Sequence, residues 1–84
     1  MAKNSNQNLD KYLVLLGKRI MSLIRNKGYS SVYQFWIHKA ADSISRRNLQ
    51  KIVKGKSNPK FLTLLEISRL LEISVSELLE IEGL

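Results

Sequence analysis

Residues 44–59 read ISRRNLQKIVKGKSNP and carry the clearest structural pattern in the chain. Its apolar residues Leu49 and Ile52 have the spacing of one face of a helix. Ser45 precedes this pattern and Gly55 follows it, which suits a helix N-cap and a C-terminal stop. The stretch therefore predicts a short helix between these two residues, followed by a loop that Gly and Pro mark on both sides.

Four further helices are predicted around this one. Upstream, apolar residues recur at helical spacing after Asp10, which can cap a helix, and Gly28 ends the pattern. Two capping boxes begin at Ser31 and Ser74 and indicate the starts of two more helices. No run of residues alternates between apolar and polar for long enough to predict a strand. The predicted helices cover residues 10–27, 31–41, 45–54, 61–71 and 74–82.

The length of the chain, 84 residues, suits a single domain with one modest core and little room for a catalytic cleft. Residues 1–9 are rich in Asn, Gln and Ser and predict a flexible N-terminal arm. The domain is then expected over residues 10–84. Together with the helix pattern, this predicts an all-α fold: a compact domain of five helices.

Charge is distributed unevenly along the chain. The chain has 14 Lys or Arg against 7 Asp or Glu, a net charge of +7. Residues 11–60 carry twelve of these cations and one acid, whereas residues 61–84 carry one cation and five acids. Such segregation is typical of a protein with one part that faces a polyanion and another that faces elsewhere. The alternative is a charged surface that only keeps the protein soluble.

Two short helices joined by a tight turn inside a basic domain indicate a helix-turn-helix. In this arrangement the second helix lies in the major groove and the first crosses the DNA backbone. Because Leu49 and Ile52 point inward, the other side of the second helix is left to read bases. Arg and Lys suit guanine, and Asn and Gln suit adenine. The candidates on that side are Arg46, Arg47, Asn48, Gln50 and Lys51.

The pattern I-S-R-x-x-L-x-x-I-x-x-G-x-x-x-P over residues 44–59 resembles the lambda-repressor-like helix-turn-helix family. This family includes phage Cro and repressor proteins and regulators of the xenobiotic-response-element type. The resemblance covers residues 13–80, where LLEI and LLEIS after residue 63 match the family's fourth helix and its link to the fifth. It implies five helices, binding to double-stranded DNA and a homodimer on an inverted-repeat operator.

The resemblance also assigns roles to individual residues. The positions that match the family's base-contacting sites are Arg46, Arg47, Gln50 and Lys51. The positions that match or surround its phosphate-contacting sites are Ser31, Ser45, Asn48, Lys54, Lys56 and Lys60.

The chain departs from the family pattern at two places. The family usually has a small Ala after the hydrophobic residue of its second helix and then a Gly at the turn. Here Trp36 follows Phe35, and the distance from Phe35 to Ile44 is longer than usual, so either the second helix is longer or the following loop is wider. In addition, Val53 stands where the family often has Glu, and we expect apolar packing to replace it.

Other residue types offer no catalytic or metal site. Cys is absent, and His38 has no second His beside it, so neither a metal ligand set nor a catalytic base is predicted. The acids after residue 61 have the spacing of solvated helix faces. Tyr33, Phe35 and Trp36 could stack on nucleobases, but core packing is favoured for Phe35 and Trp36. We therefore expect no enzyme and no cofactor.

The C-terminal stretch has more apolar residues than one helix face can bury. Candidates for a two-fold interface are Leu78, Ile81 and Leu84, and the alternative is a frayed end. No secretory signal or membrane span is seen in the sequence, so a cytoplasmic location is expected.

Together these features predict a sequence-specific regulator of transcription, and the small size of the chain favours a repressor. A protein-interaction module or antitoxin-like subunit is the main alternative, with its partner at the acidic C-terminal part and with DNA binding secondary. Binding to structured RNA is a third possibility.

Overall fold

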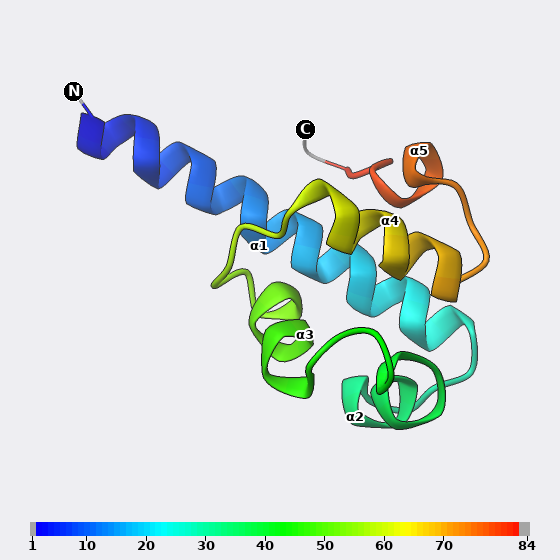
Figure 1. Ribbon diagram of the computed structural model, residues 1–84. Coiled ribbons are helices and arrows are strands. Elements are labelled where there is room, and N and C mark those ends of the chain that lie inside the picture. The colour runs from blue at the N-terminus through cyan, green and yellow to red at the C-terminus, as the bar shows by residue number, and fades with distance from the viewer. Residues whose placement is uncertain (1, 83–84) are drawn as a thin grey trace.

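The computed structural model describes residues 2–82, with side chains from residue 9 onward. Every regular element in this range is a helix (Figure 1). Because α2 continues into η1 without a break, the range contains five helices, and the predicted all-α fold is confirmed. The elements are α1 (Ala2–Asn26), α2 (Val32–Phe35), η1 (Trp36–Ala40), α3 (Arg46–Val53), α4 (Phe61–Leu70) and α5 (Val75–Leu78).

Helix α1 starts earlier than predicted. It begins at Ala2, so residues 2–9 of the expected flexible arm are helical, and Asp10 lies inside the helix rather than at its cap. The physical reason is that residues 2–9 contain neither Gly nor Pro, and extending an existing helix costs far less than starting one. As a result, the N-terminal part of α1 projects beyond the other helices (Figure 1).

The core is built against one face of α1. The predicted stripe of Leu16, Ile20 and Leu23 is buried, and Ile24 extends it. The remaining helices bury their apolar faces in the same cluster, so the chain forms one continuous core without a disulfide. Each fully buried aliphatic or aromatic side chain contributes about 1.5–3 kcal/mol. The other buried apolar residues are Phe35, Ala40, Ile44, Leu49, Ile52, Ile67, Leu71 and Leu78.

Three helices end in the same motif, in which a residue in the left-handed conformation follows the last turn. Gly28 (φ 97°) ends α1 and Gly55 (φ 72°) ends α3, as their positions in the sequence predict. At the end of α4 the same position is occupied by Glu72 (φ 61°). The sequence does not predict this conformation, because a residue with a side chain adopts it at a cost of about 1–2 kcal/mol. The Nζ of Lys27 lies 3.0 Å from Oε1 of Glu72, so this carboxylate links the end of α1 to the end of α4.

Helix α3 is held against α1 by a close backbone contact at Gly17. A Cβ at this position would lie 2.4 Å from the carbonyl oxygen of Val53 and 2.8 Å from that of Ile52. On the opposite side of the contact, a Cβ at Gly55 would lie 2.7 Å from the Cα of Val14. Glycine at both positions therefore lets the two helices approach closely enough to bury the inner face of α3.

Helix α5 is shorter than the predicted helix over residues 74–82. The guanidinium of Arg19, on α1, donates to the carbonyl oxygens of Glu77 and Leu78 at 2.7 and 3.4 Å. These carbonyls would accept from the next turn if α5 continued, so the side chain of Arg19 takes the place of that turn. The other predicted boundaries, apart from the start of α1, lie within one residue of the observed ones.

Candidate nucleic-acid interface

The two helices of the predicted helix-turn-helix are joined through a π-helical turn. α2 runs into η1, whose wider turns take up more residues per unit length than an α-helix. The N–H groups of Ser43 and Ile44 then donate to the carbonyl of Ala40 at 3.0 and 2.9 Å, which closes the turn. Residues 36–40 of the long connection are therefore helical, and the turn that follows them completes the connection to α3.

Trp36 spans this turn. Its indole Nε1–H donates to the carbonyl oxygen of Ile44 at 2.7 Å, and its ring packs against the core. The neighbouring Phe35 is fully buried, with its ring edge-on to Tyr29 at a centroid distance of 5.5 Å. Core packing of Phe35 is thus confirmed, and Trp36 fixes the residue that directly precedes the cap of α3.

We expect Trp36→Phe to lower the free energy of unfolding by about 1–3 kcal/mol, because the carbonyl of Ile44 loses its donor in a mostly buried position. Urea unfolding followed by circular dichroism measures this change. Tyr33→Phe is the control, since it also alters an aromatic residue of this helix but leaves the indole bond intact. An unfolding free energy equal to that of the wild type would show that the bond to Ile44 does not hold the turn.

Helix α3 presents a cationic surface to solvent. Ser45 caps it by accepting from the backbone N–H of Asn48 at 3.1 Å. Leu49 and Ile52 are buried as predicted. Of the residues predicted to contact bases, Arg46, Arg47 and Lys51 are exposed and Gln50 is half-buried.

The first turn of α3 contains no acid and begins with Arg46 and Arg47. Cations are disfavoured at a helix N-terminus, where the helix dipole is positive. A bound anion would relieve this repulsion. The end of α3 that carries the two arginines is therefore suited to an anionic partner.

The residues predicted to contact phosphate surround α3. Asn48, Lys54, Lys56 and Lys60 are exposed. The hydroxyl of Ser31 caps α2 by accepting from the N–H of Gln34 at 3.2 Å, and a capping hydroxyl keeps its own proton to donate. The cap hydroxyl of Ser45 has the same capacity.

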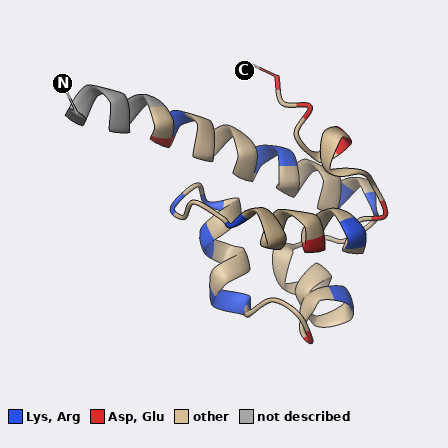
Figure 2. Ribbon diagram, turned by 45° about the horizontal axis from the view of Figure 1, so that its top comes forward, with Lys and Arg blue, Asp and Glu red and all other residues tan. Residues whose placement is uncertain are grey.

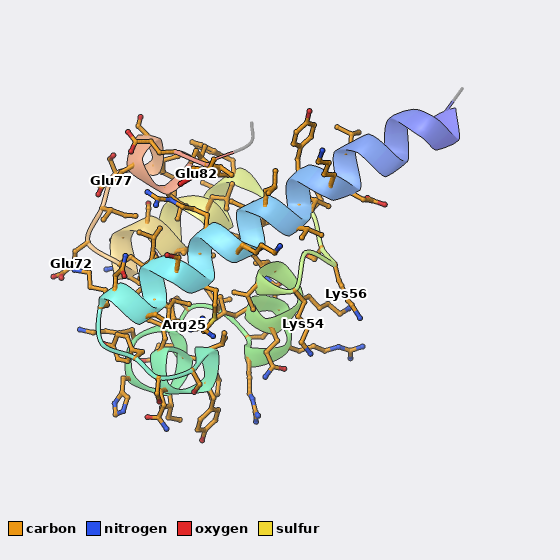
Figure 3. The ribbon with its side chains drawn as sticks, turned by 180° about the vertical axis from the view of Figure 1, so that it is seen from behind. Arg25, Lys54, Lys56, Glu72, Glu77 and Glu82 are labelled. Carbon is orange, nitrogen blue, oxygen red and sulfur yellow. The ribbon has the colours of Figure 1, made fainter. Side chains whose placement is uncertain are left out.

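The acids at the C-terminal end of the chain lie away from this surface. Figure 2 shows the Lys and Arg segments of α3 and of the loop after it on one side of the molecule, and the acidic segments near the C-terminus on the other. From behind, Lys54 and Lys56 lie at one end and Glu72, Glu77 and Glu82 at the opposite end (Figure 3). The cations of α3 and of the loop after it are thus separated in space from the C-terminal acids, although Lys27 and Arg69 each pair with an acid.

Glu66, on α4, borders the hollow beside the start of α3, which Ser43, Ser45 and Asn48 also line. Its carboxylate accepts from Nε and Nη2 of Arg69 at 2.9 and 2.6 Å. The hydrogen bonds from Arg69 and from the Ser43 hydroxyl lower the pKa of Glu66 from 4.5 to about 2. The anionic form of Glu66 therefore stabilises the link between α4 and the turn before α3.

This shift in pKa predicts a dependence of stability on pH. Because the pKa of Glu66 is lower in the folded state, its contribution is complete above pH 4.5 and is lost as the pH falls toward about 2. We expect the free energy of unfolding to fall over this range, and Glu66→Gln to make the fall less steep. Urea unfolding at a series of pH values measures both slopes. With Asp10→Asn as the control, identical slopes for the two variants would contradict the role of Glu66.

The candidates for a two-fold interface need correction. Leu78 is fully buried inside the monomer, because α5 packs this residue onto the core, and it is not available to a partner. Ile81 is half-buried against the same core. Leu84 lies outside the described residues. The apolar excess of the C-terminal stretch is thus explained largely by packing within the chain.

Two features missed by sequence reasoning lie close to α3. Gly17 sets the distance between α3 and α1. The signal that could have revealed this role is the presence of a glycine in the middle of a helix, where it costs about 1 kcal/mol relative to Ala. The second is Tyr33, whose ring lies under the guanidinium of Arg46 at 4.7 Å from the ring centroid. No local pattern indicates this contact.

The remaining surface shows no assembled metal site. Within residues 2–82, no three His, Cys, Asp or Glu residues come together as metal ligands would. The ring of His38, which is exposed, stacks on Tyr29 at a centroid distance of 6.2 Å. None of the helices in this range is both long and apolar enough to cross a membrane.

The fold and the exposed surface of α3 define a helix-turn-helix domain. A family model described as Helix-turn-helix matches residues 39–78, from the end of η1 to the end of α5. No curated protein and no solved structure gives a match to the chain. The match over residues 39–78 supports the resemblance to the lambda-repressor-like helix-turn-helix family, which is a family of DNA-binding transcription regulators.

Proposed function

We propose that this protein binds double-stranded DNA in a sequence-specific manner and regulates transcription, with α3 in the major groove. The observation that carries the proposal is the two-sided character of α3. Its inner face is buried through Leu49 and Ile52, while its exposed side carries Arg46, Arg47 and Lys51 and no acid. A helix with this division can dock on the domain and read bases at the same time.

Discrimination between bases is proposed to come from Arg46, Arg47, Gln50 and Lys51. Arg and Lys donate to the acceptors of guanine, and Gln can make paired hydrogen bonds with adenine. Each good contact of this kind contributes about 1–3 kcal/mol of discrimination. Gln50 is half-buried, so we expect it to contribute less than the exposed arginines.

Affinity that does not depend on sequence is proposed to come from the residues around α3. Lys54, Lys56 and Lys60 would lie along the phosphates and release counterions on binding, so affinity should fall steeply with salt. Hydroxyl and amide groups at the helix starts would fix the register on the backbone. These residues are Ser31, Ser45 and Asn48.

A homodimer on an inverted repeat is also proposed, with the two α3 helices roughly 34 Å apart. α4 supplies an exposed apolar surface for this contact: Phe61, Leu62 and Leu65 are 61%, 74% and 38% exposed. α4 directly follows the basic loop, so a two-fold axis at this surface would bring the two basic loops close together. This surface replaces Leu78 as the candidate interface.

We expect Leu62→Glu to weaken self-association, because it places a carboxylate in the apolar contact of both copies. Sedimentation equilibrium measures the oligomeric state, and fluorescence anisotropy compares binding to an inverted repeat with binding to one half-site. Leu9→Glu, on the projecting part of α1 where Leu9 is 59% exposed, is the control. Equal self-association in both variants would place the interface elsewhere.

Selection from a randomised pool of duplex DNA, followed by sequencing, tests the proposed function. The wild-type protein should enrich a short inverted repeat, and duplex RNA should compete poorly for it. If no motif is enriched, the proposal fails and an interaction module with its partner on the acidic side becomes the better account. Once an operator is known, a reporter under its control shows whether occupancy represses transcription by excluding polymerase.

A further inference from the structure

Three side chains form a stack across the turn between the two helices. The indole of Trp36 donates to the carbonyl of Ile44 at 2.7 Å. The ring of Tyr33, one helical turn earlier, lies against Trp36 with a centroid distance of 6.0 Å and an interplanar angle of 37°. The guanidinium carbon of Arg46 then lies 4.7 Å above the Tyr33 ring. The first residue of α3 is thus held from the preceding helix.

We propose that Tyr33 is a specificity-determining residue, which positions Arg46 to read one base. This inference rests on the proposed function and names a residue that makes it selective. A free Arg side chain must be ordered on binding, and this loss of rotamer freedom lowers affinity. A guanidinium that already rests on a ring has lost part of that freedom before DNA arrives.

An aromatic ring, unlike a carboxylate, can hold Arg46 without using its hydrogen-bond donors. A carboxylate beside Arg46 would accept hydrogen bonds from the N–H groups that guanine needs. The Tyr33 ring attracts the cation through its π electrons and leaves those N–H groups free to donate. Consistent with this, the ion pairs found among residues 9–82 involve Lys27 and Arg69, and no carboxylate pairs with Arg46.

The location of Tyr33 also favours this role. Tyr33, on α2, is 40% exposed, and its ring lies against Arg46 at the start of α3. DNA that receives α3 in its major groove would therefore cover this ring. Removing water from a cation–π pair strengthens it. The contact would therefore be stronger in the complex than in the free protein, which is the property that a specificity-determining contact needs.

The stack has a structural cause in the long connection between the helices. In place of a short glycine turn, the chain has η1 and the turn after it, and Trp36 and Tyr33 reach across that distance. Trp36 holds the backbone at Ile44, and Tyr33 holds the side chain of Arg46. The two aromatic residues thus have separate tasks.

The test measures binding to the duplex that the wild-type protein selects and to a panel with every single base-pair change. We expect Tyr33→Leu to lower affinity for the selected duplex by roughly five- to tenfold, from the difference in strength between a desolvated and an exposed cation–π pair. The loss of discrimination should be confined to the base pair that Arg46→Ala also affects. Tyr33→Phe, which keeps the ring, should behave as the wild type does.

A double-mutant cycle separates positioning from direct contact. With Arg46→Ala already present, Tyr33→Leu should have no further effect on affinity. Tyr12→Leu, at an exposed Tyr on α1, is the control for replacing a surface aromatic residue. Loss of affinity at all base pairs, loss that persists with Arg46→Ala, or a Phe variant that behaves like the Leu variant would each overturn the inference. Failure of the wild type to select any motif would instead overturn the proposed function.

Discussion

Arg46→Ala/Arg47→Ala should lower affinity for the selected duplex by roughly 30-fold to 10⁴-fold, since two base contacts at about 1–3 kcal/mol each are removed together. The fold should not change, because both side chains are exposed and the cap at Ser45 uses its own hydroxyl. Fluorescence anisotropy at fixed salt measures the loss, and circular dichroism checks that the helices are intact. The enriched inverted repeat should also disappear from a repeated selection.

The control for this double variant removes the same charge from another surface. Lys18 and Arg25 are exposed on α1 and, together with Met21 and Ser22, line a hollow on that helix. Lys18→Ala/Arg25→Ala should lower affinity only through the long-range field of the protein, and to the same extent for specific and random DNA. Equal losses in both double variants would mean that α3 contributes charge alone and does not read bases.

Gly17→Ala should lower the free energy of unfolding by about 3 kcal/mol, at the upper end of the usual cost of overpacking. The added methyl would lie 2.4 Å from the carbonyl oxygen of Val53. This obstacle is backbone at the end of α3, so no rotamer change can remove it and the two helices must separate. Urea unfolding measures the loss of stability, and amide hydrogen exchange in α3 should rise with it.

The sign of the change in the free energy of unfolding tests the close contact between α1 and α3. In an ordinary exposed helix, replacing Gly with Ala stabilises by up to about 1 kcal/mol. Gly28→Ala serves as the control, because no atom lies within 4 Å of its added Cβ and only its positive φ of 97° opposes the change. A more stable Gly17→Ala variant would show that the contact between α1 and α3 is looser than described. We also expect the Gly17 variant to bind DNA more weakly, because a displaced α3 no longer fits the groove.

The candidate interface could be predicted where residue type and helical spacing are sufficient. Ser45 and Gly55 mark the limits of α3, and Leu49 and Ile52 mark its inner face, so the outward residues follow by elimination. The same reasoning could not predict the stack on Arg46. Tyr33 is 13 residues away, and the contact depends on a π-helical turn that no sequence pattern indicated.

The C-terminal stretch packs within the monomer, whereas its composition predicted a contact with a second copy. By composition Leu78 looked available to a second copy, but the guanidinium of Arg19 ends α5 and the core covers Leu78. The two most exposed large apolar residues, Phe61 and Leu62, are instead at the start of α4 and directly follow the basic loop. For this reason the proposed dimer surface is on α4 and does not include Leu78.

Residue types and their spacing were sufficient to predict the helices, most of their ends and the resemblance to the helix-turn-helix family. Caps, glycine stops and apolar periodicity act between residues at most a few positions apart, so they can be read along the chain. The tertiary structure alone decided the close contact at Gly17, the left-handed Glu72 and the position of Arg46 on Tyr33. These features depend on which distant residues meet when the apolar faces are buried, and that is set by packing in three dimensions rather than by local propensity.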